Sequence, residues 1–72
     1  MEVKITNPDG EERTLVVGNY EVLLYNDEGM FLKSLFRSEI RGLVEMSKYK
    51  ERPEWKEFWE KVLEHFDNHH KV

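Results

Sequence analysis

The spacing of the apolar residues changes near residue 36, and this change sets the fold class. Before it, apolar and polar residues alternate, as Val3 and Ile5 do on either side of Lys4, which is the period of a half-buried strand. After it, apolar residues recur every three or four positions, which is the period of a helix that faces a core. The sequence therefore predicts an α+β protein with strands in its N-terminal half and helices in its C-terminal half.

Turn residues divide the N-terminal half into four strands. The segment Asn7-Pro8-Asp9-Gly10 matches a type I turn closed by a glycine bulge, because Pro presets φ at the second position and Gly tolerates positive φ at the fourth. Residues 26–29 repeat this Asn-x-x-Gly pattern, and Gly18-Asn19 predicts a two-residue hairpin loop with positive φ. We expect an antiparallel meander with strands over residues about 2–6, 12–17, 20–25 and 30–35.

Two helices are expected to follow, over residues about 39–50 and 54–67. Ser38 is suited to cap the first helix, and Pro53 ends it and begins the second, because proline restricts the preceding residue but fits the first helical position. The second helix has the strongest amphipathic pattern in the chain, with Trp59 near the middle of its apolar face. That face consists of Trp55, Phe58, Trp59, Val62, Leu63 and Phe66. We expect one domain over residues 1–72, with both helices packed on one face of the sheet.

The chain is short for a protein that folds alone. Seventy-two residues bury only about 60% of the surface of the unfolded chain, and the absence of cysteine removes disulfides and thiolate zinc sites as sources of stability. The longest apolar run, Val22 to Tyr25, is far below the roughly 20 residues that cross a bilayer. The first residues lack the charged and then apolar layout of a secretory signal. We therefore expect a soluble, cytoplasmic protein that relies on good packing or on self-association.

Residue usage gives one indication of origin. The chain contains no Ala and no Gln but many Glu, Lys and Arg residues, a bias reported for proteins of hyperthermophiles. This composition favours a thermophilic source.

The residue types used in catalysis and metal binding do not form a constellation in the sequence. The three histidines, His65, His69 and His70, all lie in the last eight residues. His65 and His69 have the i, i+4 spacing of metal ligands, but a closed site needs four ligands and no cysteine or distant ligand accompanies them. The serines lack a nucleophile-elbow context, and the glycines form no phosphate-binding motif. The sequence predicts a protein that is not an enzyme and holds no metal or cofactor.

One segment, residues 37–52, is locally basic. Its basic residues are Arg37, Arg41, Lys48, Lys50 and Arg52. Together with the ring of Tyr49, they are typical of a platform for single-stranded nucleic acid. Three glutamates interleave with them, and the net charge of the whole chain is −4, which disfavours general nucleic-acid binding. A nucleic-acid-binding regulator that uses this segment is the alternative function.

The predicted sheet has more apolar residues than helices on one face can cover. Neighbouring residues of a strand point to opposite faces, so the run from Val22 to Tyr25 makes both faces of the third strand apolar. Leu23 and Tyr25 share one of these faces, and we expect Val16 and Leu32 to extend it. The first helix likewise carries a second apolar stripe of Gly42, Met46 and Tyr49, opposite its core residues Ile40, Leu43 and Val44.

These surplus apolar residues predict an interaction module. Monomers rarely expose more than a few hundred Å² of contiguous apolar surface, and a symmetric dimer buries the same patch on both copies. We therefore expect a small protein that forms a homodimer or binds a larger protein. The seam is either the sheet face with Leu23 and Tyr25 or the stripe of Gly42, Met46 and Tyr49, and the area of Leu23 and Tyr25 favours the sheet.

Overall fold

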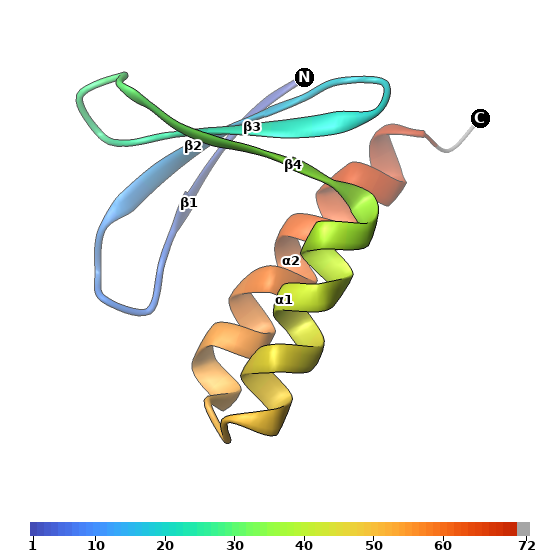
Figure 1. Ribbon diagram of the computed structural model, residues 1–72. Coiled ribbons are helices and arrows are strands. Elements are labelled where there is room, and N and C mark those ends of the chain that lie inside the picture. The colour runs from blue at the N-terminus through green and yellow to red at the C-terminus, as the bar shows by residue number, and fades with distance from the viewer. Residues whose placement is uncertain (71–72) are drawn as a thin grey trace.

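The computed structural model, which describes residues 1–70, contains one antiparallel sheet followed by two helices (Figure 1). The strands are β1 (Glu2–Thr6), β2 (Glu12–Val17), β3 (Glu21–Tyr25) and β4 (Phe31–Phe36), and their order in the sheet is their order in the chain. The helices are α1 (Arg37–Tyr49) and α2 (Pro53–His69). The predicted α+β class and the four-stranded meander are confirmed.

The two Asn-x-x-Gly turns have the same hydrogen bonds. The backbone oxygens of Asn7 and Asn26 accept the N–H groups of Gly10 and Gly29 at 2.9 and 3.1 Å. Each Asn side-chain oxygen also accepts the backbone N–H groups two and four residues later. Both glycines have φ near +80°, a conformation that residues with a Cβ rarely adopt. These contacts confirm the predicted turn with its glycine bulge.

The hairpin loop between β2 and β3 differs from its prediction. The N–H of Gly18 donates to the backbone oxygen of Glu21 at 2.9 Å, so these residues face each other and the loop consists of Asn19 and Tyr20. Neither Gly18 nor Asn19 has a positive φ. The predicted loop was therefore wrong by one residue and in its backbone conformation. The bulky ring of Tyr20 within the loop is the physical reason, because such residues disfavour positive φ.

Strand β4 continues into α1 without a connecting loop. The helix begins at Arg37, two residues earlier than predicted, so Ser38 lies in its first turn and the prediction that Ser38 is the N-cap was wrong. Phe36 occupies the cap position, and its backbone N–H donates to Oε1 of Glu39 at 3.0 Å. This carboxylate satisfies a backbone donor at the start of the helix, where negative charge is also favourable.

The connection between the helices contains a residue in the left-handed conformation. Glu51 has φ +55°. Its backbone N–H donates to the backbone oxygen of Lys48, and the N–H of Arg52 donates to the backbone oxygen of Ser47. This arrangement closes α1, and glycine is the usual residue at such a position because it has no Cβ.

We expect the substitution Glu51→Gly to raise the stability of the protein by about 1 kcal/mol, because it removes the cost of placing a side chain in the left-handed region. The midpoint of urea unfolding measures this change. Glu51→Ala is the matched control, since it removes the same charge but keeps the Cβ. Equal gains from both variants would contradict the backbone explanation and point to the charge of Glu51.

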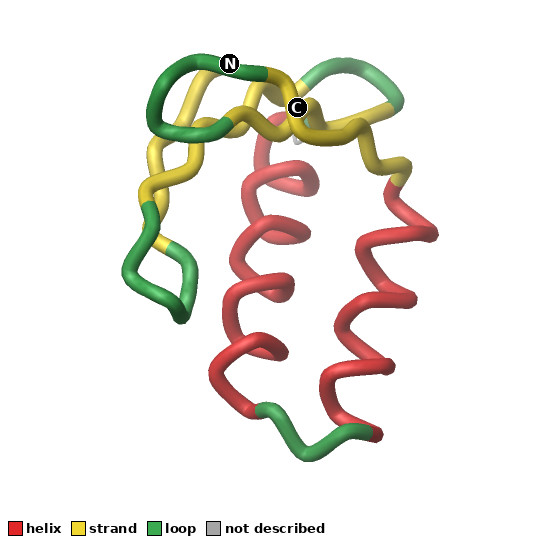
Figure 2. Tube along the Cα trace, turned by 60° about the vertical axis from the view of Figure 1, so that its left-hand side comes forward, coloured by secondary structure: helices red, strands yellow, loops and turns green. Residues whose placement is uncertain are grey.

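The core lies between one face of the sheet and the two helices, which Figure 2 shows below that face. Trp59 is only 7% exposed and packs edge-on against Phe58, with the ring centroids 4.9 Å apart. The predicted burial of Trp59 is thus confirmed. The buried apolar residues are Leu15, Val17, Val22, Leu24, Leu35, Ile40, Phe58, Trp59, Val62 and Phe66. Within residues 1–70, neither helix is long and apolar enough to cross a membrane.

Candidate interaction surface

The sheet face that points away from the helices is apolar across its centre. Leu23 of β3 lies opposite Val16 of β2, and Tyr25 lies opposite Phe31 of β4. The rings of Tyr25 and Phe31 meet edge to face with their centroids 5.7 Å apart. Since Leu24, the neighbour of both Leu23 and Tyr25, is buried on the helix side, both faces of β3 are apolar. The position of Val16 on the outer face is as predicted.

Strand β4 carries the most exposed apolar residues of the sheet. Phe31, Leu32 and Phe36 are 56%, 43% and 54% exposed, whereas Leu23 and Tyr25 are partly buried. A bulge at Leu32 interrupts the pairing with β3, because Lys33 lies opposite Leu24 while Phe31 lies opposite Tyr25. Within residues 1–70, β3 is the one strand that pairs with β4, so the apolar side chains of β4 border a free edge.

The stripe on α1 is exposed as well. Met46 and Tyr49 are 52% and 89% exposed, and a Cβ placed on Gly42 would meet no other atom within 4 Å. The space beside Gly42 is therefore open in the single chain. The sheet face was expected to offer more apolar area than this stripe, but Met46 and Tyr49 are more exposed than the partly buried Leu23 and Tyr25.

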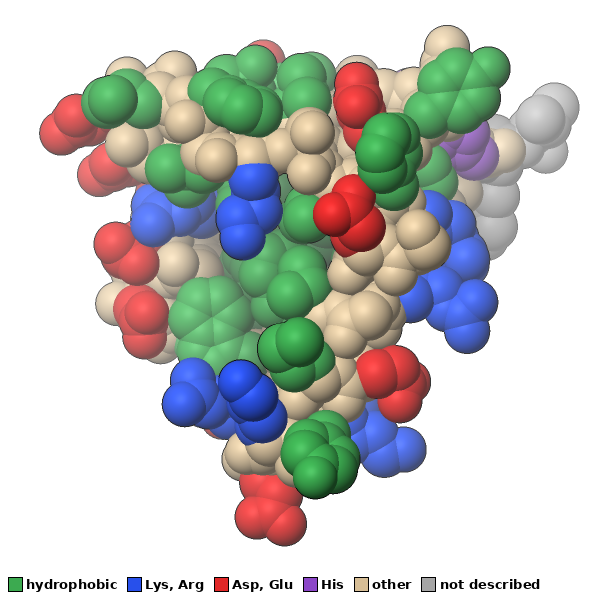
Figure 3. Space-filling view, in the orientation of Figure 1, with side chains coloured by type: hydrophobic (Ala, Val, Ile, Leu, Met, Phe, Trp, Pro, Cys, Tyr) green, Lys and Arg blue, Asp and Glu red, His purple; other side chains and the backbone are tan. Residues whose placement is uncertain are grey.

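A hollow of about 390 Å³ joins the β4 edge to the α1 stripe. Figure 3 shows hydrophobic side chains along the sheet and in the space between the sheet and α1. The hollow is lined by Lys33, Leu35, Glu39, Gly42, Leu43 and Met46. Lys33 and Glu39 are charged, and the rest of the lining is apolar. The hollow thus places the α1 stripe beside the edge of β4, whereas Leu23 and Tyr25 lie on the other face of the sheet.

The basic residues of the alternative hypothesis are all exposed and are divided between α1 and the connection that follows it. Arg37, Arg41 and Lys48 lie on one side of α1 by their spacing, while Lys50 and Arg52 lie in the connection to α2. The first of these basic residues, Arg37, forms an ion pair with an acidic residue of α2. Nε and Nη2 of Arg37 donate to the two carboxylate oxygens of Asp67 at 3.0 and 3.3 Å.

The ion pair of Arg37 and Asp67 joins the start of α1 to the end of α2. The hydrogen bonds from Arg37 lower the pKa of the Asp67 carboxyl below its ordinary value. A lowered folded-state pKa contributes stability at neutral pH, and this contribution is lost as the pH falls through that pKa. Because both side chains are nearly half exposed, solvent weakens the attraction.

We expect Asp67→Asn to lower the thermal midpoint slightly at pH 7, and this difference from wild type should shrink as the pH falls from 7 through the lowered pKa of Asp67. Thermal unfolding followed by circular dichroism across this range measures the difference. Glu64→Gln, which removes another carboxyl from α2, is the control. A difference between wild type and Asp67→Asn that does not shrink as the pH falls would mean that the pair does not stabilise through its charge.

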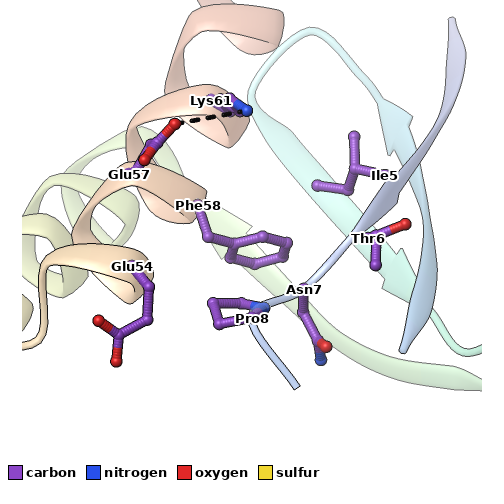
Figure 4. Close-up of a pocket in the computed structure, with 8 residues that line it drawn as sticks. All are labelled: Ile5, Thr6, Asn7, Pro8, Glu54, Glu57, Phe58 and Lys61. Carbon is purple, nitrogen blue, oxygen red and sulfur yellow. Dashed lines mark ion pairs between the residues drawn. The ribbon is translucent and has the colours of Figure 1, made fainter. Parts of the chain in front are cut away.

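A second cleft lies between the turn after β1 and the start of α2 (Figure 4). It measures about 380 Å³, and the ring of Phe58 faces Pro8 across it. The carboxylate of Glu57 pairs with Nζ of Lys61 at 3.6 Å, while that of Glu54 points away from this pair. The cleft thus offers an apolar wall with a charged rim.

The three histidines lie at the end of α2. In residues 1–70, no group of three or more His, Asp or Glu side chains is placed to hold a metal ion. His65 is partly buried, and His69 and His70 are exposed. The ring nitrogens of His70 lie 2.8 and 2.7 Å from the backbone oxygens of Phe66 and Asn19. His70 therefore connects the end of α2 to the β2–β3 hairpin.

Sequence reasoning did not single out Phe36 as a surface residue. A signal was present, since an apolar pair at each end of the segment Phe31-Leu32-Lys33-Ser34-Leu35-Phe36 cannot be buried by one face of an edge strand. Comparison of the chain with protein-family models, curated proteins and solved structures finds no match. The function is therefore inferred from the chemistry of the surface itself.

Proposed function

We propose that this chain is a small, non-enzymatic interaction module whose partner is a second copy of itself. One observation carries the proposal: the exposed large apolar residues gather on one side of the molecule. Eight such residues are exposed in the structure, and five of them belong to β4 and α1. These five are Phe31, Leu32, Phe36, Met46 and Tyr49.

The opposite edge of the sheet has a different character. The outer face of β1 carries Glu2, Lys4 and Thr6, and Nζ of Lys4 lies 3.7 Å from a carboxylate oxygen of Glu12 on β2. Charged residues at an edge strand discourage pairing with another chain, whereas apolar residues at a free edge favour it. The contrast between β1 and β4 supports association through one edge of the sheet.

Self-association would also compensate for the small core of the domain. A chain of 72 residues buries a small core, and a two-fold interface would bury the same apolar patch on each copy. Each exposed apolar residue of β4 and α1 then contributes twice to the joint structure. This gain does not require a pocket or a charged site.

Light scattering after gel filtration tests the proposal. At micromolar concentration we expect a mass of about twice the 8.7 kDa of one chain. Leu32→Lys, which places a charge on the apolar edge, should shift the mass towards that of one chain. Thr6→Lys adds the same charge to the opposite edge and should leave the dimer intact. A wild-type protein that stays monomeric at millimolar concentration would overturn the proposal.

An oligonucleotide titration separates this function from nucleic-acid binding by residues 37–52. Affinity that falls steeply with salt, and that Arg41→Glu weakens, would indicate contacts with phosphates and favour the alternative. If the self-associating module is correct, we expect no binding even at low salt. The net charge of −4 and the pairing of Arg37 with Asp67 support this expectation.

A further inference from the structure

We propose that the two copies join through β4, which pairs antiparallel with β4 of the second copy about a two-fold axis at Ser34. The inference rests on the proposed function and specifies its seam. The two four-stranded sheets would become one continuous sheet of eight strands. The α1 stripes of the two copies would lie beneath the joined strands.

Strand β4 offers a free row of backbone hydrogen-bonding groups. In the part of the chain that the structure describes, β3 is its one neighbour in the sheet, so alternate N–H and C=O groups point towards the free edge. Five of its six residues are exposed, and three of those five are large and apolar. An exposed apolar edge of this kind is a template for another strand.

Charge and the length of β4 restrict the register of the pairing. Residues directly opposite each other in a sheet share a face, so a two-fold axis must pass between two copies of the same residue. An axis at Lys33 would place two ammonium groups opposite each other. An axis at Leu35 would place Leu32 opposite residue 38, which lies beyond the end of β4, so this exposed side chain would have no partner strand. An axis at Ser34 avoids both problems.

The register at Ser34 creates favourable pairs. It places Leu32 opposite Phe36 of the second copy, so that two exposed apolar side chains cover each other. It also places Lys33 opposite Leu35 of the second copy. Leu35 and Glu39 line the same hollow, so the ammonium group of Lys33 meets a carboxylate of the second copy there. The edge is thus complementary to itself in both shape and charge.

The hollow between β4 and α1 opens beside the β4 edge, and its helical wall contains Gly42 and Met46. The two-fold axis brings the hollows of both copies together, which allows the two α1 stripes to face each other under the sheet. The open space beside Gly42 leaves room for this approach. One interface then uses the β4 edge and the α1 stripe, while the outer face around Leu23 stays open.

A single cysteine at the axis tests the register directly. The natural chain has no cysteine, so Ser34→Cys has one thiol, placed opposite its own copy at a distance that a disulfide spans. Under mild oxidation we expect most of the protein to form a covalent dimer that a reductant reverses. Thr6→Cys, on the outer face of the opposite edge, is the matched control. We expect it to form at least about tenfold less covalent dimer.

The outcomes distinguish this seam from the proposed function. A wild-type dimer by light scattering, together with no more cross-linking at Ser34→Cys than at Thr6→Cys, would overturn the β4 seam and leave self-association standing. A wild-type monomer would overturn both. Amide hydrogen exchange on the unmodified protein gives an independent measure. The exchange of β4 amides should slow by about tenfold or more as the protein concentration rises through the dimerisation range, while that of β1 amides stays constant.

A charge reversal tests the contact with Glu39. Lys33 is exposed in the single chain, so Lys33→Glu should leave the monomer folded. In the dimer it would place a carboxylate near Glu39 of the second copy, and we expect the dissociation constant to rise by about tenfold or more. Lys56→Glu, which reverses the same charge on α2, should leave dimerisation unchanged. Equal dissociation constants for Lys33→Glu and wild type would exclude the register at Ser34.

Discussion

Replacing Trp59 with alanine is expected to lower the free energy of unfolding by about 3–5 kcal/mol. Trp59 lies on the buried face of α2, where its ring packs edge-on against Phe58 and stacks on Trp55. Domains of this length have a total stability of roughly 4–11 kcal/mol, so the substitution removes a large share of it. Urea unfolding followed by far-ultraviolet circular dichroism measures the change.

Trp55→Ala is the matched control for Trp59→Ala. Trp55 belongs to the same helix and the same aromatic cluster but is only partly buried, so we expect a smaller loss of stability. A Trp59→Ala variant with a well-dispersed amide spectrum and an unchanged unfolding midpoint would contradict the central position of this ring. Two variants with equal losses would mean that the cluster, rather than the buried position, sets the effect.

The sequence predicted those parts of the fold that local chemistry decides. The Asn-x-x-Gly turns form because one Asn side chain and one Gly conformation satisfy several backbone groups within five residues. The α2 face was predictable because its apolar residues repeat with the helical period. The exact β2–β3 loop was not predictable, because the segment Gly18-Asn19-Tyr20 allows a two-residue loop of either Gly18-Asn19 or Asn19-Tyr20. Pairing of Gly18 with Glu21 across the sheet selects one of them.

The start of α1 shows where tertiary structure overrides a local signal. Ser38 has the side chain of an N-cap, but Phe36 is still held by the sheet opposite Glu21, and Arg37 already has helical structure. The helix therefore begins where the strand ends, and Glu39 supplies the hydrogen bond that a cap would have made.

The candidate surface depended on tertiary packing, which the alternation of apolar residues along the chain shows only in part. Both faces of β3 could be predicted as apolar from alternation alone. The exposure of Phe31 and Phe36, however, follows from the position of β4 at the edge of the sheet and from the bulge at Leu32. Likewise, only the packing of α1 beside β4 shows that the stripe on the helix and the edge of the sheet share one hollow.

The second large loss of stability is expected for Leu24→Ala, and the same substitution at its neighbour Leu23 is the comparison. Leu24 is 5% exposed on the helix side of the sheet and lies opposite Leu15, which is fully buried. Leu24→Ala should therefore lower the free energy of unfolding by about 2–5 kcal/mol, and this loss should not depend on protein concentration. Leu23 points to the outer face and is only partly buried, so Leu23→Ala should cost less in the single chain.

The same pair of variants reports on what covers the outer face. Association of folded copies adds to stability by mass action, so unfolding midpoints of a dimer rise with concentration. If the second copy joins at the β4 edge, the wild-type midpoint rises with concentration, and the loss caused by Leu23→Ala stays small because the centre of the outer face remains open. If instead two copies stack through their outer faces, the loss caused by Leu23→Ala grows at high concentration and approaches that of Leu24→Ala. Urea titrations of the three proteins at about 1 and 100 μM decide between the two arrangements, since only face-to-face stacking buries Leu23 of one copy against another.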